Sequence, residues 1–151
     1  MSFAFGSKTQ RRLIIERVRA QLAAESDALL LEGAEFSSWD EAFDILNDRY
    51  WNGSLPKIPT TAVHDKGKWY GLYTHSGKIE LNLRYNLSRL EYFGVLLHEM
   101  CHHYVEETYQ HGYNAASGGR VIGHGKEWKA EMRRVGYTGK ITRFSGSDRF
   151  E

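Results

Sequence analysis

The feature that most constrains the fold of this chain is the run His98-Glu99-Met100-Cys101-His102, which lies within an apolar stretch of helical character. On an α-helix, residues four positions apart lie on the same face, about one turn from each other. A helix through this run would direct the imidazoles of His98 and His102 toward one point, with Glu99 beside them. This H-E-x-x-H pattern is typical of a metalloprotease site, in which the histidines bind zinc and the glutamate acts as general base.

The simpler interpretation of this run is an amphipathic helix whose histidines lie at a polar edge. Apolar residues on both sides of the run argue against it, because Leu96, Leu97 and Val105 predict a largely buried helix. Buried imidazoles and a buried carboxylate need strong partners, and a divalent cation provides them. The residues therefore favour a metal site, and zinc is the expected ion.

A catalytic zinc usually has three protein ligands and an open position for water, so a third ligand is needed. The metzincin spacing would require glycine at 105 and histidine at 108, where this chain has Val105 and Thr108. His103 lies about 100° round the helix from His102 and is predicted to point elsewhere. His111 follows close to the end of the helix and is a weak candidate.

The best candidate for the third ligand is His124, which lies between Gly123 and Gly125. The two glycines would let the backbone bring an imidazole close to the metal, and the helix that follows would fix its position. Glu127 and Glu131 on that helix are the rival third ligands, since a carboxylate on a second helix can complete such a site.

The remaining patterns predict an α+β fold. Capping boxes and glycine stops predict four helices: from Ser7 to a stop at Gly33, from Ser38 to Trp51, from Ser88 through Val105, and from about Lys126 to Val135. Three short β-prone runs lie between the second and third helices, at residues 61–64, 69–73 and 78–81. Because glycine-bearing turns separate them, they predict a three-stranded antiparallel meander on which the helices pack.

Length and composition indicate one globular domain over residues 1–151, with an N-terminal helix within 1–36 and a short polar tail at 139–151. The single cysteine, Cys101, excludes an internal disulfide and a cysteine zinc ribbon, and it favours an intracellular, cytoplasmic protein. No apolar run is long enough to suggest a signal peptide or a membrane span.

The formal net charge of +1 does not indicate a nucleic-acid-binding protein. Residues 111–151 nevertheless carry eight basic against four acidic residues. A solvated surface is the simpler explanation for this bias. A basic C-terminal region that contacts DNA phosphates is the alternative.

Four blocks, in this order, resemble the SprT-like (SprT/Spartan-type) zinc metallopeptidase family. These are residues 43–56, with the pattern N-x-x-Y/F-x-x-G-x-L, the strand at 79–82, the H-E-x-x-H helix at 96–102, and residues 123–128, with the pattern G-H-G-x-x-F/W. The resemblance covers about residues 40–135. An ordered set of four blocks is far more specific than any one of them.

This resemblance implies a small zincin-like (minimal metalloprotease) domain of α+β class, with a short sheet beside the helix that carries the site. It implies His98, His102 and His124 as ligands of one zinc ion and Glu99 as catalytic base. The implied activity is endopeptidase cleavage of protein substrates, including proteins crosslinked to DNA. The cysteine zinc ribbon that many bacterial members use near DNA is missing from this sequence, which weakens the expectation of DNA contact.

Two other functions stay open at this stage. One is a DNA- or partner-binding module in which zinc is structural and no proteolysis takes place. The other is hydrolysis of a non-peptide bond. Among auxiliary residues, a tyrosine or an arginine is expected to stabilise the oxyanion, and the tyrosine candidates are Tyr104, Tyr109, Tyr113 and Tyr137. His64 and His75 are interpreted as ordinary residues near strands, and 69–73 as core or as an edge strand for a substrate backbone.

Overall fold

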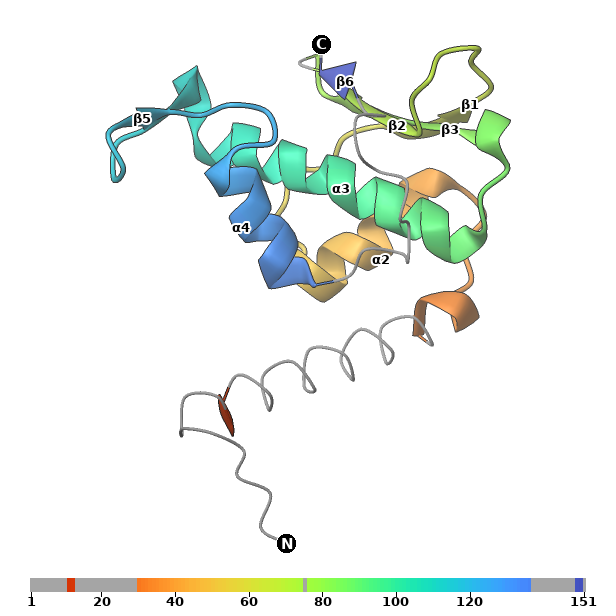
Figure 1. Cartoon of the computed structure of the whole chain (residues 1–151). Helices are drawn as coiled ribbons and strands as arrows, with labels where there is room; N and C mark the ends of the chain where they lie inside the picture. The colour runs from red at the N-terminus through yellow and green to blue at the C-terminus, as the bar shows by residue number, and fades with distance from the viewer. Residues whose placement is uncertain (1–10, 13–29, 75, 137–148, 151) are drawn as a thin grey trace, which may run out of the picture.

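The structure is a computed structural model that describes residues 11–12, 30–74, 76–136 and 149–150 (Figure 1). Its helices are α2 (Trp39–Trp51), α3 (Arg89–Thr108) and α4 (Lys126–Val135), with 3-10 turns η1 (Leu83–Tyr85) and η2 (Gln110–Gly112). Its strands are β1 (Thr60–Val63), β2 (Gly71–Thr74), β3 (Lys78–Asn82), β4 (Tyr113–Asn114), β5 (Gly119–Arg120) and β6 (Arg149–Phe150). The predicted α+β class is confirmed. Most of the predicted first helix lies outside the described residues, but its end at Gly33 agrees with the prediction.

Helix α3 runs through the middle of the molecule, between the sheet on one side and α2 and α4 on the other (Figure 1). Its predicted capping box is present: the Glu91 amide donates to Ser88 Oγ at 3.1 Å, and the Ser88 amide donates to Glu91 Oε1 at 3.2 Å. Every residue from Tyr92 to His103 is buried. A helix that is buried all round belongs to the core, so the histidines do not lie at a polar edge.

The sheet has the strand order β1-β3-β2-β6, which corrects the predicted meander. Strands β2 and β3 are antiparallel, as expected, but β1 pairs with β3 in parallel. The segment after β1 is held across the end of β3 by the buried side chain of Asn82. Its Nδ2 donates to the carbonyls of Asp65 (3.1 Å) and Trp69 (3.0 Å), and its Oδ1 accepts from the Asp65 amide (3.0 Å). The chain therefore crosses to the far side of β3 before it enters β2.

The other edge of β2 is paired as well. Strand β6 runs parallel to it, with Leu72 opposite Arg149 and Tyr73 opposite Phe150. Within the described residues, β2 is thus an inner strand and not the edge strand that we considered for a substrate backbone.

Helix α3 forms one core with α2 and the sheet. The largest fully buried side chains of this core include Phe43 and Leu46 of α2, Ile79 of β3, and Phe93 and Leu96 of α3. None of the helices in the described part of the chain has both the length and the apolar character needed to cross a membrane.

Candidate metal centre

The structure brings three histidines together at one end of the α3–α4 contact. His98 and His102 lie one turn apart on α3, with ring centroids 5.0 Å apart and only 3% and 4% of their surfaces exposed. His124 completes the group, with its Nε2 3.2 Å from His98 Nε2. One nitrogen from each of the three rings lies within 4.8 Å of the others.

His124 reaches the other two rings because the chain makes a tight turn just before α4. The Gly125 amide donates to the Ile122 carbonyl at 3.1 Å. A Cβ atom at position 125 would lie 2.8 Å from Ile122 Cγ1 and 3.0 Å from Ile122 O, so only glycine fits without displacing the turn. The glycine after His124 therefore has a steric role in presenting the imidazole.

Trp128 fixes the orientation of the imidazoles. Its ring stacks on His102 with a centroid distance of 5.2 Å and an interplanar angle of 16°, and it lies 4.6 Å from His98 and 4.7 Å from His124. Its Nε1 donates to the His98 carbonyl at 3.3 Å. The sequence reasoning gave Trp128 no role of its own, although Trp128 is the aromatic residue of the G-H-G-x-x-F/W pattern that includes His124.

Glu99 is 1% exposed and lies where β2 makes its closest approach to α3. That approach depends on Gly71, where an added Cβ would lie 2.5 Å from Val95 Cγ1, 3.1 Å from Glu99 Cγ and 3.2 Å from Glu99 Oε1. The sequence reasoning also missed Gly71, although an isolated glycine in a strand pattern is a known sign of close backbone contact. Strand β2 therefore forms a wall directly against the Glu99 side chain.

His103 points away from the group, as predicted from its position on the helix. Its Nε2 lies 2.7 Å from the Pro56 carbonyl and its Nδ1 lies 3.2 Å from the Tyr73 hydroxyl. A carbonyl only accepts hydrogen bonds, so Nε2 carries the proton and the Tyr73 hydroxyl donates to Nδ1. Both nitrogens of His103 are therefore engaged in packing β2 and the 56–60 segment against α3.

The rival third ligands are not part of this group. Among the described residues, the metal-capable group contains His98, His102 and His124 alone. Glu131 forms an ion pair with Arg134, and Glu127 is buried at the start of α4. Of the other histidines, His64 is exposed, His111 lies in η2, and His75 is outside the described residues.

The donor set fits a first-row transition metal. Three imidazole nitrogens suit zinc and its neighbours better than magnesium or calcium, which prefer oxygen ligands. Cys101 is fully buried and outside the group, and burial raises the pKa of its thiol well above the ordinary value. His98 and His102 are buried and His124 is partly buried, and His102 also borders a cavity.

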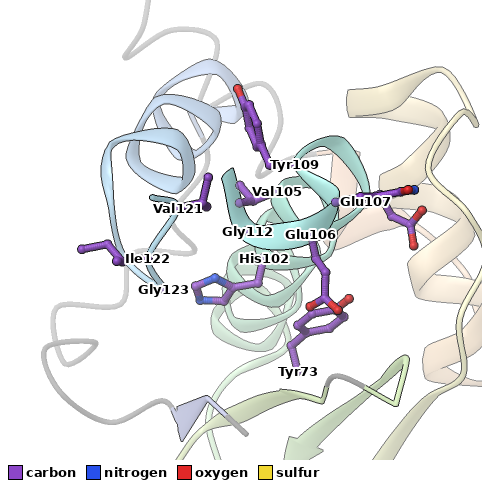
Figure 2. A pocket seen from close by; sticks show the side chains of 11 residues that line it. Tyr73, His102, Val105, Glu106, Glu107, Tyr109, Gly112, Val121, Ile122 and Gly123 are labelled. Atoms are coloured by element: carbon purple, nitrogen blue, oxygen red, sulfur yellow. The ribbon is translucent and has the colours of Figure 1, made fainter. Parts of the chain in front are cut away.

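That cavity has a volume of about 670 Å³ and is bordered by His102 itself (Figure 2). Of the four tyrosines expected near an oxyanion, Tyr109 lines it, Tyr104 packs against the core, Tyr113 is 55% exposed, and Tyr137 lies outside the described residues. Tyr73 of β2 also lines the cavity, which the sequence reasoning did not anticipate. Burial raises the pKa of Tyr73, and the negative charge of Glu106 adds to the effect.

Comparison with known proteins identifies a family. A family model described as the SprT-like family matches residues 39–147, which is most of the chain and includes all three histidines. No curated protein and no solved structure matches the chain.

Proposed function

The chain belongs to the SprT-like family, and from this membership and the three-histidine group we propose that it is a zinc-dependent endopeptidase. The observation that carries the proposal is the approach of three imidazole nitrogens to within 4.8 Å of one another, on a buried helix where Glu99 follows His98 directly. In this proposal His98, His102 and His124 hold one zinc ion.

A zinc ion held there would supply Lewis-acid polarisation of the scissile carbonyl and would lower the pKa of a water molecule. The protein's own part is proton transfer, orientation and exclusion of solvent. Glu99, which is next to His98 on the same helix, accepts the proton of the attacking water and delivers it to the leaving amine. Gly71 and Val95 restrict this carboxylate from the side of the sheet, and Trp128 holds the rings of His98 and His102.

The proposed substrate is protein, and proteins bound or crosslinked to DNA are the finer proposal. It is supported by the family resemblance and by the surface of α4, which exposes Lys126, Lys129 and Arg133 on the helix that follows His124. Phosphate contacts by such side chains would weaken as the salt concentration rises.

The decisive experiment compares the wild-type protein with Glu99→Gln. Both proteins are analysed for zinc and incubated with casein and with a DNA-binding protein, with and without single-stranded DNA. We expect one zinc ion per chain in both, and loss of cleavage by about 10²–10⁴-fold in the variant, because general-base catalysis typically contributes that much. Glu107→Gln is the matched control, since Glu107 is an exposed glutamate on the same helix.

A variant Glu99→Gln that cleaves as fast as the wild type would overturn the role of Glu99. Wild-type protein that is folded and zinc-loaded but cleaves neither substrate would instead favour a DNA-binding module with structural zinc. The exposed basic residues of α4 support that second candidate. It predicts DNA binding that depends on salt and is unchanged by Glu99→Gln.

A further inference from the structure

The cavity beside His102 provides information about the side chain that a substrate would carry. It begins at the metal-ligating face of α3 and extends past the end of the helix to the 121–123 segment. With a volume of about 670 Å³ it lies in the usual range of ligand pockets. A peptide bond placed at the three histidines would therefore have one of its neighbouring side chains in this cavity.

One wall of the cavity is apolar. Val105 of α3, together with Val121 and Ile122 from the segment before α4, forms this wall. Ile122 is 65% exposed, which makes it one of the few large apolar residues in the described part of the chain that are open to solvent. A bound side chain with a long hydrocarbon stem would cover these three residues and remove their surface from water.

The other side of the cavity is negative. Figure 2 shows Glu106 pointing toward Tyr73 with its carboxylate over the phenol, whereas Glu107 projects to the other side of the helix, away from His102. None of the described residues that line the cavity is a lysine or an arginine. The charges of both glutamates, after burial, hold the pKa of Tyr73 above its ordinary value, which indicates a negative potential at this end.

We propose that this cavity binds a lysine or arginine side chain of the protein substrate, next to the scissile bond, with Glu106 as the residue that determines the preference. The hydrocarbon stem of such a side chain lies along Val105, Val121 and Ile122, and its cationic end pairs with the Glu106 carboxylate. Long basic side chains commonly bury the stem and keep the charge at a polar end. This inference rests on the proposed peptidase function and names the class of substrate that the site prefers.

The test uses a peptide series built on a cleavage site in casein that is first located by mass spectrometry. On each side of the scissile bond in turn, the residue is lysine, arginine, norleucine or glutamate. Norleucine matches the length of lysine without its charge. On one side of the bond we expect kcat/KM to be about five to ten times higher for lysine and arginine than for norleucine, the effect of about 1 kcal/mol or slightly more from a partly exposed ion pair.

Two substitutions assign the preference to Glu106. In Glu106→Gln we expect lysine and norleucine peptides to be cleaved equally fast, and in Glu106→Lys we expect the glutamate peptide to become the preferred one. Glu107→Gln is the matched control and should keep most of the preference. Binding of the same peptides to Glu99→Gln, measured by fluorescence anisotropy, should show the same order without any cleavage.

The outcomes separate this inference from the proposed function. If the wild-type protein cleaves all peptides with equal kcat/KM, or if Glu106→Gln keeps the preference for lysine, the inference is wrong while the peptidase function stands. If the zinc-loaded protein cleaves neither casein nor any peptide, the proposed function fails and the inference fails with it.

Discussion

The contact between Gly71 and Glu99 allows a sharp test of how the sheet supports the site. In Gly71→Ala the new Cβ would lie 2.5 Å from Val95 Cγ1, whereas carbon atoms in ordinary contact are about 3.5–4.0 Å apart. The overlap of roughly 1 Å falls in a buried contact between β2 and α3, since Val95 is fully buried. Either the strand or the helix must therefore move.

The expected change in the free energy of unfolding of Gly71→Ala follows from two opposing effects. Over-packing of a core typically costs about 1–3 kcal/mol, while replacing glycine by alanine stabilises by about 0.4–1 kcal/mol through the unfolded state. The first effect is larger, so the free energy of unfolding should fall by about 1–2 kcal/mol. Each kcal/mol corresponds to a Tm lower by ~2–4 °C for a chain of this size.

Gly71→Ala should reduce the rate of cleavage more strongly than it reduces stability, because the same Cβ would also lie 3.2 Å from Glu99 Oε1. A displaced general base costs rate steeply, with about 10²-fold for a misplacement of 1 Å as the upper end. We expect kcat for casein cleavage to fall by about tenfold or more while the zinc content stays the same. Thermal unfolding, peptide cleavage and metal analysis measure the three quantities.

Gly119→Ala is the matched control, because Gly119 is also a strand glycine and its added Cβ would have nothing closer than Lys126 Nζ at 3.6 Å. A double-mutant cycle with Val95→Ala, which removes the nearest atom, should show that the double variant is more stable than the sum of the single losses predicts. Strictly additive losses, or a Gly71→Ala protein with the Tm and activity of the wild type, would refute the steric argument.

Three further predictions concern stability. Asn82→Ala should lower the free energy of unfolding in urea by about 2–4 kcal/mol, because it leaves the backbone groups of Asp65 and the buried carbonyl of Trp69 without the amide that they bond to. A loss under 1 kcal/mol would contradict the role of Asn82 in the crossover. Removal of zinc by a chelator should lower Tm, because an ion present at about 100 times its Kd stabilises the folded protein by ~2.7 kcal/mol. The difference in Tm with and without chelator should largely disappear in His124→Ala. Burial, and then the charge of Glu106, raises the pKa of Tyr73 above its ordinary value of about 10. The folded protein therefore keeps a proton that the unfolded chain loses above about pH 10, and stability should fall as the pH rises beyond that value. Urea unfolding at pH 9 to 11 should show a shallower fall in Tyr73→Phe, and an unchanged slope would contradict this assignment.

The parts of the fold that could be predicted from the sequence depend on residues that are only a few positions apart in the chain. The start of α3 follows from Ser88 and Glu91, three positions apart, and its burial follows from the apolar residues on both sides of His98. The strand order could not be predicted in this way, because the parallel pairing of β1 with β3 depends on Asn82, whose side chain bonds to residues 13 to 17 positions away.

The same distinction applies to the site. The spacing of His98 and His102 is a property of one helix and is readable from five residues. The approach of His124 was suggested by its flanking glycines and by the family pattern. The contacts of Trp128 and Gly71 depend on how α4 and β2 pack against α3. The glycine within the 69–73 run indicates a close backbone approach, but the sequence does not tell which residue lies opposite it.

The origin of His124 outside α3 also has a consequence for how a metal ion would be taken up under the proposed function. His98 and His102 take up their final spacing as soon as α3 forms, whereas His124 lies 26 residues beyond His98 and reaches it only when the turn at Ile122–Gly125 and the docking of α4 are complete. A chain that is still being synthesised therefore offers a two-nitrogen site of low affinity, and the third nitrogen joins it after α4 has left the ribosome. A metal ion held by all three histidines would therefore bind late in the biosynthesis of this protein, and it would close the loop between His98 and His124.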